Sequence, residues 1–332
     1  MSLTESGPTG SAALRAAAPQ VLCAGIAVLD AVFGVAQFPV PEAKTDASAF
    51  MIISGGCAAN AAVAIARLGG WARFAGPLGG PAGAEAIGDR IVAALAGEQV
   101  DCADCPRVPG VASSMSAICI DPHGERAIVN YRDDRLAAAR PSDPSALVAS
   151  AAAVLADNRF PEFVLPICTA ARARGIPVVL DADKPTRATD SLLRIATHVV
   201  FSAEGLRATA GTDDPAAGLE RIAALSGSFL AVTDGAQGVF WLAPGRQRKG
   251  CRMSAFPVRP IDTLAAGDVF HGAFALALAE GRAEADALRF AAAAAAIKCT
   301  RFGGITGAPG RAEVEAFLAT AQGGACEVPD EA

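Results

Sequence analysis

The segment DTLAAGDVFHGAF, residues 262–274, places two aspartates around a run of small residues, directly before an apolar stretch that predicts a helix. Small residues such as Ala265, Ala266 and Gly267 let a ligand approach the backbone closely. The free N–H groups and the positive dipole end of a helix N-terminus favour an anion such as phosphate. Asp268 stands in the first turn, where it would take the proton from a hydroxyl that attacks phosphorus.

The same segment allows a purely structural interpretation of Asp268. An aspartate at the start of a helix can simply cap the free backbone N–H groups. Two other phosphate-binding motifs are excluded, because no Gly-Lys-Ser/Thr follows, as it would in a Walker A loop, and the first predicted strand-to-helix turn lacks GxGxxG. The segment alone therefore leaves both capping and proton transfer open.

The bulk composition excludes several classes of partner. The chain has 332 residues, of which 52% are hydrophobic and 19% charged, and this fits one large α/β domain with an appendage. The net charge is −6 and there is no basic block, so nucleic acid is not an expected partner. No apolar run reaches the length of a transmembrane helix, so we expect no membrane partner.

The N-terminus and the cysteines indicate the compartment. Residues 1–20 lack the apolar block of a signal peptide and predict a disordered tail. Nine cysteines, an odd number, are scattered through apolar segments, which is typical of reduced thiols. The pair Cys102 and Cys105 has neither a second CxxC nor paired histidines, so we predict no zinc site there. We therefore expect a soluble cytoplasmic protein.

Strands and helices are predicted to alternate after about residue 145. Short apolar runs such as IPVVLDAD and GSFLAVTDG end in acids and are separated by helical stretches. This pattern is typical of a parallel, doubly wound sheet, whose ligands lie beyond the carboxyl ends of the strands. The run VLCAGIAVLD predicts a further buried strand. The acids expected at these strand ends are Asp30, Asp157, Asp181, Asp183 and Asp234.

Two extended segments differ from this alternation. Residues 113–131 hold two β-rich runs around DPHGE, which has the composition of a hairpin turn. Residues 30–53 are also predicted to be extended, and Pro39 and Pro41 favour an edge strand or a loop. We predict that the two segments form a small separate sheet.

Three motifs resemble those of the ribokinase, or PfkB, family of sugar kinases. DTLAAGDVF is similar to the family's DTxGAGDxF signature. SGGCAANA, followed by ARLG, is similar to its GGxxxN…ARLG signature, and VTDGAQG is similar to its nucleotide-binding VTxGxxG turn. The motifs stand in the family's order, and the resemblance spans about residues 21–320.

This resemblance implies a fold, a domain layout and an assembly. The fold would be a three-layer α/β/α sandwich with a small β-sheet lid. The kinase domain would span residues 21–322, with lid segments at about 31–53 and 112–133 and short tails at 1–20 and 323–332. Members of the family often dimerise through the lid, so we expect a homodimer.

The resemblance also implies ATP as the phosphoryl donor, Mg²⁺ as a cofactor and a role for each matching residue. Asp268 would be the catalytic base, and the anion hole would be the turn of Ala265, Ala266 and Gly267. The sugar hydroxyls would be held by Asp30, Gly56 and Asn60. The nucleotide would be bound by Thr233, Gly235, Gly238 and Gly304.

Two positions depart from the family's pattern. Ala265 stands where the family has glycine, which is a mild change unless the backbone there has a positive φ. FSAEG, residues 201–205, supplies Glu204 but no asparagine three residues earlier, as the family's NxxE element has. Of this element only the glutamate is present, and Glu204 is the candidate contact for Mg²⁺ or its water. His271 receives no role from the resemblance.

A narrower resemblance concerns the acceptor. Segments such as DPHGERAIVNY and VLADNRF are similar to the 6-deoxy-6-sulfofructose kinases, which phosphorylate O1 of a ketose that carries a sulfonate at C6. The residues that match that subfamily's sulfonate-binding positions are Lys44, Asn130 and Arg159. A guanidinium fork suits a three-oxygen anion. Lys44 could instead be a solvated surface residue.

Other acceptors stay open at this point. One lysine and one arginine do not decide between anions, so fructose 6-phosphate, tagatose 6-phosphate and 2-keto-3-deoxygluconate are alternatives. A neutral sugar such as ribose would leave Arg159 without an anionic partner. A nucleoside is disfavoured, because aromatic residues make up only 5% of the chain. A non-catalytic nucleotide- or sugar-binding regulator is a further alternative, although it would not need Asp268.

Overall fold

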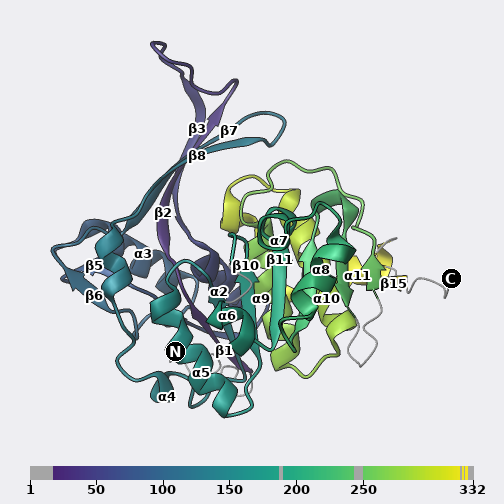
Figure 1. Ribbon diagram of the computed structural model, residues 1–332. Coiled ribbons are helices and arrows are strands. Elements are labelled where there is room, and N and C mark those ends of the chain that lie inside the picture. Colours follow the sequence, from purple (N-terminus) through teal and green to yellow (C-terminus); the bar gives the residue numbers. More distant parts are fainter. Residues whose placement is uncertain (1–17, 187–189, 243–249, 322–323, 325, 328–332) are drawn as a thin grey trace, which may run out of the picture.

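A nine-stranded sheet forms the centre of the molecule (Figure 1). The structure is a computed structural model that describes residues 18–186, 190–242, 250–321, 324 and 326–327. The order of the strands is β15–β14–β13–β12–β11–β10–β9–β1–β4. Their bounds are β1 Gln20–Ala24, β4 Trp71–Ala75, β9 Ala153–Asp157, β10 Val178–Ala182, β11 His198–Ser202, β12 Phe229–Thr233, β13 Val239–Leu242, β14 Gly250–Met253 and β15 Cys326–Glu327.

The strands from β4 to β12 in this order run parallel, as the sequence predicts. The sheet continues beyond β12 with the antiparallel strands β13, β14 and β15, which the prediction of a purely parallel sheet did not include. The short 3₁₀ turn η2 (Gly235–Gln237) joins β12 to β13. A parallel neighbour needs a crossover of a dozen or so residues, so this short turn allows only an antiparallel partner.

Helices cover both faces of the sheet, which confirms the predicted three-layer α/β/α sandwich. Alternate residues of β1 point to opposite layers, because Val21 and Cys23 pack into one cluster and Leu22 and Ala24 into the other. The first layer holds α2 Cys57–Arg67, α3 Ala86–Gly97, α9 Ala266–Ala279, α10 Glu284–Cys299 and α11 Arg311–Thr320. The second layer holds α4 Pro144–Leu147, α5 Pro161–Ala173, α6 Ser191–Ile195, α7 Ala203–Ala210 and α8 Pro215–Ala223.

Small residues bring α2 and α9 into close contact. A Cβ added at Gly272 of α9 would lie 2.5 Å from the carbonyl oxygen of Ala61 in α2, so a larger residue there would separate the helices. The buried positions of α2 are mostly alanine, which also permits a short distance between the two helix axes. This packing places Asn60 of α2 beside the first turn of α9.

A second sheet of four strands projects from the body of the molecule (Figure 1). Its order is β3–β2–β7–β8, with bounds β2 Val28–Val35, β3 Ala47–Gly55, β7 Ser114–Ile120 and β8 Arg126–Tyr131. One face carries a small apolar cluster of Val32, Ile118 and Ile120, packed against Leu264 and Phe302 of the body. These strands fall within the two extended segments of the sequence, which form the separate sheet that we predicted. A further small sheet pairs β5 Leu78–Gly80 with β6 Arg107–Pro109.

The first apolar run of the chain is divided between the two large sheets. The chain leaves the central sheet after Ala24 and enters the second sheet at Val28. Gly25 lies between them, and a Cβ at this position would be only 2.1 Å from Asp157 Oδ2. The prediction that Asp30 ends a central strand is therefore wrong, because Asp30 lies inside β2.

The described residues near both ends of the chain belong to the central sheet. Gln20 begins β1, and residues 1–17 of the predicted N-terminal tail lie outside the described residues. In the predicted C-terminal tail, the short strand β15 pairs with β14, and most other positions lie outside the described residues. Of the helices that the structure describes, none is both long enough and apolar enough to cross a membrane.

Asp262 and Lys298 form a buried ion pair beneath the loop that leads into α9. Lys298 Nζ lies 3.1 Å from Asp262 Oδ2 and donates to the Asp262 carbonyl oxygen at 2.7 Å, and neither side chain is more than 1% exposed. The Asp262 carboxylate also accepts backbone N–H groups of Leu264, Gly303 and Gly304 at 2.7–3.0 Å. Burial lowers the pKa of Lys298, whereas the charge of Asp262 opposes this effect. The pair thus joins α10 to the two turns that flank the N-terminus of α9.

Lys298→Ala should lower the free energy of unfolding by about 3–5 kcal/mol, because the Asp262 carboxylate would stay buried without its counter-charge. Urea denaturation measures this loss. Arg301→Ala is the control, since its pair with Glu313 is largely exposed and should contribute about 1 kcal/mol or less. Equal losses in the two variants would contradict the structural importance of the buried pair.

Candidate active site

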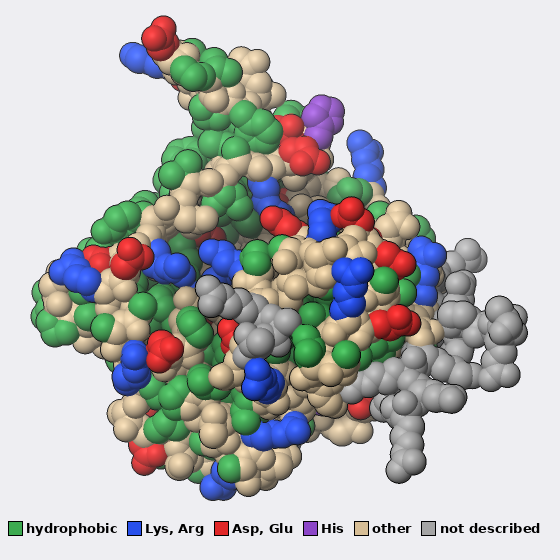
Figure 2. All heavy atoms as spheres, in the orientation of Figure 1, with side chains coloured by type: hydrophobic (Ala, Val, Ile, Leu, Met, Phe, Trp, Pro, Cys, Tyr) green, Lys and Arg blue, Asp and Glu red, His purple; other side chains and the backbone are tan. Residues whose placement is uncertain are grey.

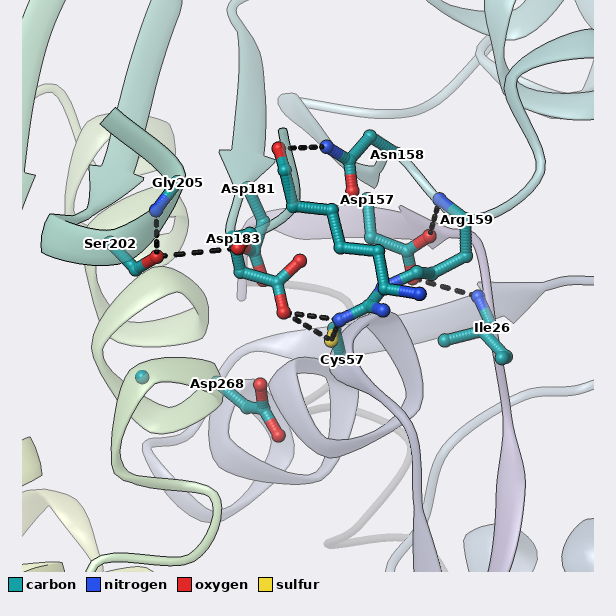
Figure 3. A network of polar contacts seen from close by, with 12 residues as sticks. Ile26, Cys57, Asp157, Asn158, Arg159, Asp181, Asp183, Ser202, Gly205 and Asp268 are labelled. Atoms are coloured by element: carbon teal, nitrogen blue, oxygen red, sulfur yellow. Dashed lines mark hydrogen bonds and ion pairs between the residues drawn. The ribbon is translucent and has the colours of Figure 1, made fainter. Parts of the chain in front are cut away.

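Three aspartates gather at the carboxyl ends of neighbouring parallel strands (Figure 3). Asp157 ends β9, Asp181 lies opposite it in β10, and Asp183 follows β10. Asp268 faces them from the first turn of α9, as Figure 3 shows. Cys57 begins α2, and its Sγ and carboxylate oxygens of Asp181 and Asp268 all lie within 4.8 Å of one another. The strands and the helix N-terminus that the sequence predicts separately therefore meet at one site.

Asp157 is a structural member of this group. Its carboxylate accepts backbone N–H groups from Ile26 at 2.7 Å, Ala58 at 3.2 Å and Arg159 at 2.9 Å. The side chain is fully buried, and burial raises its pKa, whereas the hydrogen bonds from Ile26 and Arg159 lower it. Asp157 therefore holds three segments around the site instead of facing a ligand.

Asp268 has the surroundings of a general base. Asn60 Nδ2 donates to Asp268 Oδ2 at 2.7 Å across the contact between α2 and α9. Burial raises the pKa of Asp268 to about 6, and the hydrogen bond from Asn60 opposes part of this rise. A carboxylate with a pKa near neutrality is matched to the transfer of a proton from a hydroxyl. Asn60 Oδ1 is buried and has no hydrogen-bond partner in the described structure, so it can accept a hydrogen bond from a ligand.

The turn before Asp268 is open and unusual in its backbone. Ala265 precedes α9 with φ 64°, in the left-handed region, so the alanine in place of the family's glycine costs about 1 kcal/mol. We expected the change from glycine to alanine to be mild unless the backbone at this position has a positive φ. Because the φ of Ala265 is positive, the change is not mild. A Cβ at Gly267 would meet nothing within 4 Å, so this position faces open space, whereas the N–H group of Ala266 already donates to the carbonyl oxygen of Thr263 at 3.2 Å.

His271 lies buried below this turn. Its Nδ1 is 2.7 Å from the carbonyl oxygen of Gly267, and its Nε2 is 3.2 Å from that of Val200. Nε2 also lies 3.5 Å from Asp181 Oδ1, which has no hydrogen bond of its own. Burial lowers the pKa of His271. The ring thus connects the turn of α9 to β11 and to the acids of β10, a role that the sequence alone did not assign.

Asp30 belongs to a row of polar residues across the second sheet. Asp30, Ser116 and Asn130 stand opposite one another on β2, β7 and β8. Ser116 Oγ donates to Asn130 Oδ1 at 2.8 Å. Burial raises the pKa of Asp30 to about 6, and a hydrogen bond with Ser116 opposes the rise. The sequence predicted no role for Ser116. The alternation in SSMSAICI nevertheless places Ser116 on the same face of β7 as the buried Ile118.

The turn that leads into α2 requires glycine. A Cβ at Gly55 would lie 1.9 Å from Asp30 Oδ2, so the Asp30 carboxylate rests against this backbone. Gly56 has φ 94°, and a Cβ there would lie 2.5 Å from the carbonyl oxygen of Ile26. Gly56 is thus a conformational requirement of the turn, and Asp30 lies close to the helix that carries Asn60.

Arg159 points into the group of acids (Figure 3). Its Nη2 contacts Asp183 Oδ2 and lies 3.7 Å from Cys57 Sγ. The side chain of Arg159 is 16% exposed and that of Asp183 is 31% exposed, so the pair lies at the edge of the site. The sequence predicted Arg159 as a ligand for an anion and gave no role to Asp183.

Lys44 lies away from this pair. It is exposed in the turn between β2 and β3, at the end of the long hairpin in Figure 1. Val35 already lies about 17 Å beyond Asp30 along β2, at the usual rise of a strand, and Lys44 follows farther on. The structure therefore does not bring Lys44 together with Asn130 and Arg159 in one chain.

The candidate nucleotide residues lie on the other side of α9. Thr233 ends β12, and Gly235 and Gly238 belong to the turn that follows it. A Cβ at Gly238 would lie 2.0 Å from the carbonyl oxygen of Met253, which excludes a side chain there. Gly304 begins η3 (Gly304–Gly307) and packs against Leu264, directly before the turn of α9.

Glu204 is exposed in the first turn of α7. Ser202, which caps this helix by accepting the N–H of Gly205, also donates to the carbonyl oxygen of Asp183 at 3.3 Å. Through this contact the N-terminus of α7 borders the acids of β10 (Figure 3). Glu204 is thus a solvent-exposed carboxylate of the α7 layer, whereas Asp181 is a buried carboxylate that faces His271 of α9.

Comparison with solved structures defines the class of protein. A candidate ribokinase from Agrobacterium tumefaciens superposes with a TM-score of 0.86 and 38% identity, over 91% of this chain and 98% of that one. The ribokinase of Arabidopsis thaliana, solved with ribose and ATP, gives a TM-score of 0.76 and 25% identity, over 92% and 99%. The fold is therefore ribokinase-like, as predicted.

The family follows from the sequence comparisons. The profile of the pfkB family of carbohydrate kinases matches residues 18–311. The ribokinase of Haemophilus influenzae is 30% identical over 305 residues, which cover 87% of this chain and 95% of that protein. This chain belongs to the pfkB family of carbohydrate kinases. The predicted family and the predicted enzyme class, a sugar kinase, are confirmed.

Asn60→Ala should raise the pKa of Asp268 by about one pH unit, because the variant loses a hydrogen bond to the ionised carboxylate. Carbon-13 NMR titration of the aspartate carboxyl groups measures this change. Ser116→Ala is the control, since it should raise the pKa of Asp30 and leave Asp268 unaffected. An unchanged Asp268 titration in Asn60→Ala would show that Asn60 does not determine the state of this carboxylate.

Proposed function

We propose that this chain transfers the γ-phosphoryl group of ATP to a hydroxyl of a sugar, with Asp268 as the catalytic base. The observation that carries the proposal is the contact between Asp268 and Asn60 at the open N-terminus of α9. It places a carboxylate with a raised pKa beside backbone N–H groups that can stabilise a phosphoryl group. The ATP and ribose found with the Arabidopsis relative support ATP and a sugar as the two substrates here.

Each residue of the site has a separate role in the proposed reaction. Asp268 takes the proton of the attacking hydroxyl, and the backbone N–H groups of Gly267 and Asp268 in the first turn of α9 stabilise charge on the transferred phosphoryl group. Asp30 and Asn60 Oδ1 accept hydrogen bonds from other sugar hydroxyls, which orients the acceptor. The nucleotide lies along Thr233, Gly235, Gly238 and Gly304.

Mg²⁺ is part of the proposal as the cofactor of the nucleotide. This ion prefers oxygen ligands and usually binds one or two carboxylates together with substrate phosphates. Asp181 and Glu204 supply such oxygens, and Asp181 Oδ1 is buried without a hydrogen bond. Cys57 does not suit Mg²⁺, because a thiol is a soft ligand. When bound, the ion would neutralise phosphate charge.

The acceptor that we propose is an anionic ketose, 6-deoxy-6-sulfofructose, phosphorylated at O1. The support is Arg159, a cation that follows β9, which is separated in the central sheet by β10 and β11 from β12 and its candidate nucleotide residue Thr233. Fructose 6-phosphate, tagatose 6-phosphate and 2-keto-3-deoxygluconate carry anions that suit the same cation. Lys44 keeps a role in this scheme only if it reaches the pocket of a partner subunit.

A neutral sugar such as ribose is the second candidate acceptor. The observation in its favour is the pairing of Arg159 with Asp183, which already neutralises the cation. The curated relatives from Haemophilus influenzae and Bacillus subtilis are both ribokinases. An anionic acceptor must therefore displace Asp183 from Arg159, whereas a neutral acceptor would leave the pair intact.

Asp268→Asn should lower turnover by about 10²–10⁴-fold while the fold is retained, because the amide cannot take the proton. Release of ADP measures turnover, and circular dichroism checks the fold. Asp213→Asn is the matched control, since Asp213 is 90% exposed and pairs only with Arg207 on the surface. Normal turnover in Asp268→Asn would show that Asp268 is not the catalytic base.

The same assay distinguishes the acceptors when it is run with 6-deoxy-6-sulfofructose, fructose 6-phosphate, 2-keto-3-deoxygluconate, fructose, ribose and adenosine. A kcat/KM for sulfofructose at least about a hundredfold above that for the others would support the sulfonate proposal. A preference for ribose or fructose would replace it with a neutral sugar. ATP and sugar binding without ADP release would instead favour a non-catalytic regulator.

We also propose that the chain forms a homodimer through the outer face of the second sheet. That face is apolar, and Figure 2 shows hydrophobic side chains over much of the projecting sheet. Its large apolar side chains are 36–73% exposed, and they are Phe50, Ile52, Met115, Val129 and Tyr131. A contiguous apolar face of this kind is typical of a protein–protein interface.

Val129→Asp should convert the dimer to a monomer, because it would bury a charge within the proposed interface. Light scattering coupled to gel filtration measures the mass. Leu225→Asp is the control, since Leu225 is 53% exposed on the body of the molecule and should not affect the mass. A monomeric parent chain, or a dimeric Val129→Asp variant, would contradict this interface.

A cytoplasmic location completes the proposal. The eight cysteines whose side chains the structure describes are all free thiols. Reduced cysteines are typical of a reducing compartment, where sugar phosphorylation also finds its ATP.

A further inference from the structure

Three cations from three different segments converge beside the acceptor pocket. Arg132 directly follows β8, Arg159 follows β9 and Lys184 follows β10. Arg132 Nη1 donates to the carbonyl oxygen of Arg159 at 3.3 Å, and its guanidinium lies 5.4 Å from the centre of the Phe160 ring. Asn158 Nδ2 donates to the carbonyl oxygen of Lys184 at 3.0 Å, which ties the β10 loop to the β9 loop. We call Arg132, Arg159 and Lys184 the cationic cluster.

The charges of the cationic cluster act on one another. Burial lowers the pKa of Lys184, and the positive charges of Arg159 and then Arg132 lower it further. Cations held this close repel each other, which is unfavourable unless an anion lies between them. In the described part of the chain, Arg132 and Lys184 take part in no ion pair, and the acid paired with the cluster is Asp183, through Arg159. The positive charge without an acidic partner therefore lies on Arg132 and Lys184, whereas Asp183, Asp157 and Asp181 all act on Arg159.

The cluster stands at a suitable distance from the reacting end of the site. Arg159 Nη2 is 3.7 Å from Cys57 Sγ, and Cys57 Sγ lies within 4.8 Å of an Asp268 carboxylate oxygen. Arg159 Nη2 and the nearer Asp268 carboxylate oxygen are thus no farther apart than the sum of these two distances. Basic and acidic side chains lie side by side in the hollow where the second sheet joins the body (Figure 2). A sugar whose hydroxyl meets Asp268 would direct its far end toward the cationic cluster.

We propose that Arg132, Arg159 and Lys184 form a subsite for the terminal oxyanion of the acceptor, and that Asp183 occupies Arg159 until this anion displaces it. The proposal rests on the proposed sugar kinase function. Two guanidinium forks and an ammonium provide more donors than one carboxylate can use, and they suit a three-oxygen sulfonate or phosphate, or a carboxylate. Asp183 then competes with the anion of the acceptor for Arg159. This competition weakens the binding of neutral sugars less than that of anionic sugars. This subsite lies in one chain, and it does not need Lys44.

The test is calorimetric titration of sugars onto the full chain without ATP, so that it needs no turnover. The probes are 6-deoxy-6-sulfofructose, fructose 6-phosphate and 2-keto-3-deoxygluconate, with fructose as the neutral reference. We expect at least one anionic sugar to bind about tenfold or more tightly than fructose, and the difference to shrink as salt is added. The anion that binds most tightly identifies the group that the subsite recognises.

Variants assign this preference to the proposed residues. Arg132→Gln and Lys184→Gln should each weaken binding of the anionic sugar about tenfold and leave fructose unaffected. Asp183→Asn should strengthen binding of the anionic sugar by a similar factor, because Arg159 is then released. Arg135→Gln is the matched control, since Arg135 follows in the same loop, is 65% exposed and pairs with Asp133. Arg135→Gln should change the affinity neither for the anionic sugars nor for fructose.

Two outcomes would overturn the subsite. One is equal affinity for fructose and all three anionic sugars, and the other is an equal loss for neutral and anionic sugars in Arg132→Gln and Lys184→Gln. Thermal unfolding checks that each variant is folded. Failure of the proposed function would look different, because the anionic preference and its response to the variants would persist while no ADP is released.

Discussion

The close packing of α2 against α9 is the contact on which the site depends. Gly272 lies over the carbonyl oxygen of Ala61, and the small side chains around it let the helices approach. Only at this distance can Asn60 reach Asp268 across the two helices. The hydrogen bond orients the carboxylate and opposes the effect of burial on its pKa. Helix packing, which is a property of the core, thus sets the chemistry at the surface of the site.

Charge balance is the second constraint. Asp157, Asp181, Asp183 and Asp268 lie at one edge of the sheet with few cations among them. Each acid is accommodated differently: Asp157 by three backbone N–H groups, Asp183 by Arg159 and Asp268 by Asn60. Asp181 Oδ1 has no hydrogen bond among the described residues and lies near the ring of His271. The carboxylates that have the fewest internal partners are those that can serve a cation or an acceptor.

The second sheet has two faces of different character. Its inner face carries the row of Asp30, Ser116 and Asn130, whereas its outer face carries exposed apolar side chains such as Val129. Neighbouring residues of a strand point to opposite faces, so Asn130 and Val129 serve different surfaces although they are adjacent in sequence. The end of β8 also sets the position of Arg132 at the rim of the pocket.

The sequence by itself determined the three-layer fold and the family, because these depend on local patterns. The apolar strands ending in acids, the small residues before α9 and the glycines before α2 can all be recognised without knowing what they contact. Motif order along the chain was also sufficient to propose Asp268, Asn60 and Asp30 as candidate site residues.

Only the tertiary structure decided which distant residues meet and which conformation each one takes. The division of the first apolar run between two sheets follows from the position of Asp157, which leaves no room for a side chain at Gly25. The positive φ of Ala265 and the exposed place of Lys44 are likewise invisible in a pattern of residue types. The pairing of Arg159 with Asp183 joins the ends of two strands, 24 residues apart in sequence. Such contacts depend on strand order and loop direction, because a local pattern fixes the type of an element but not its neighbours.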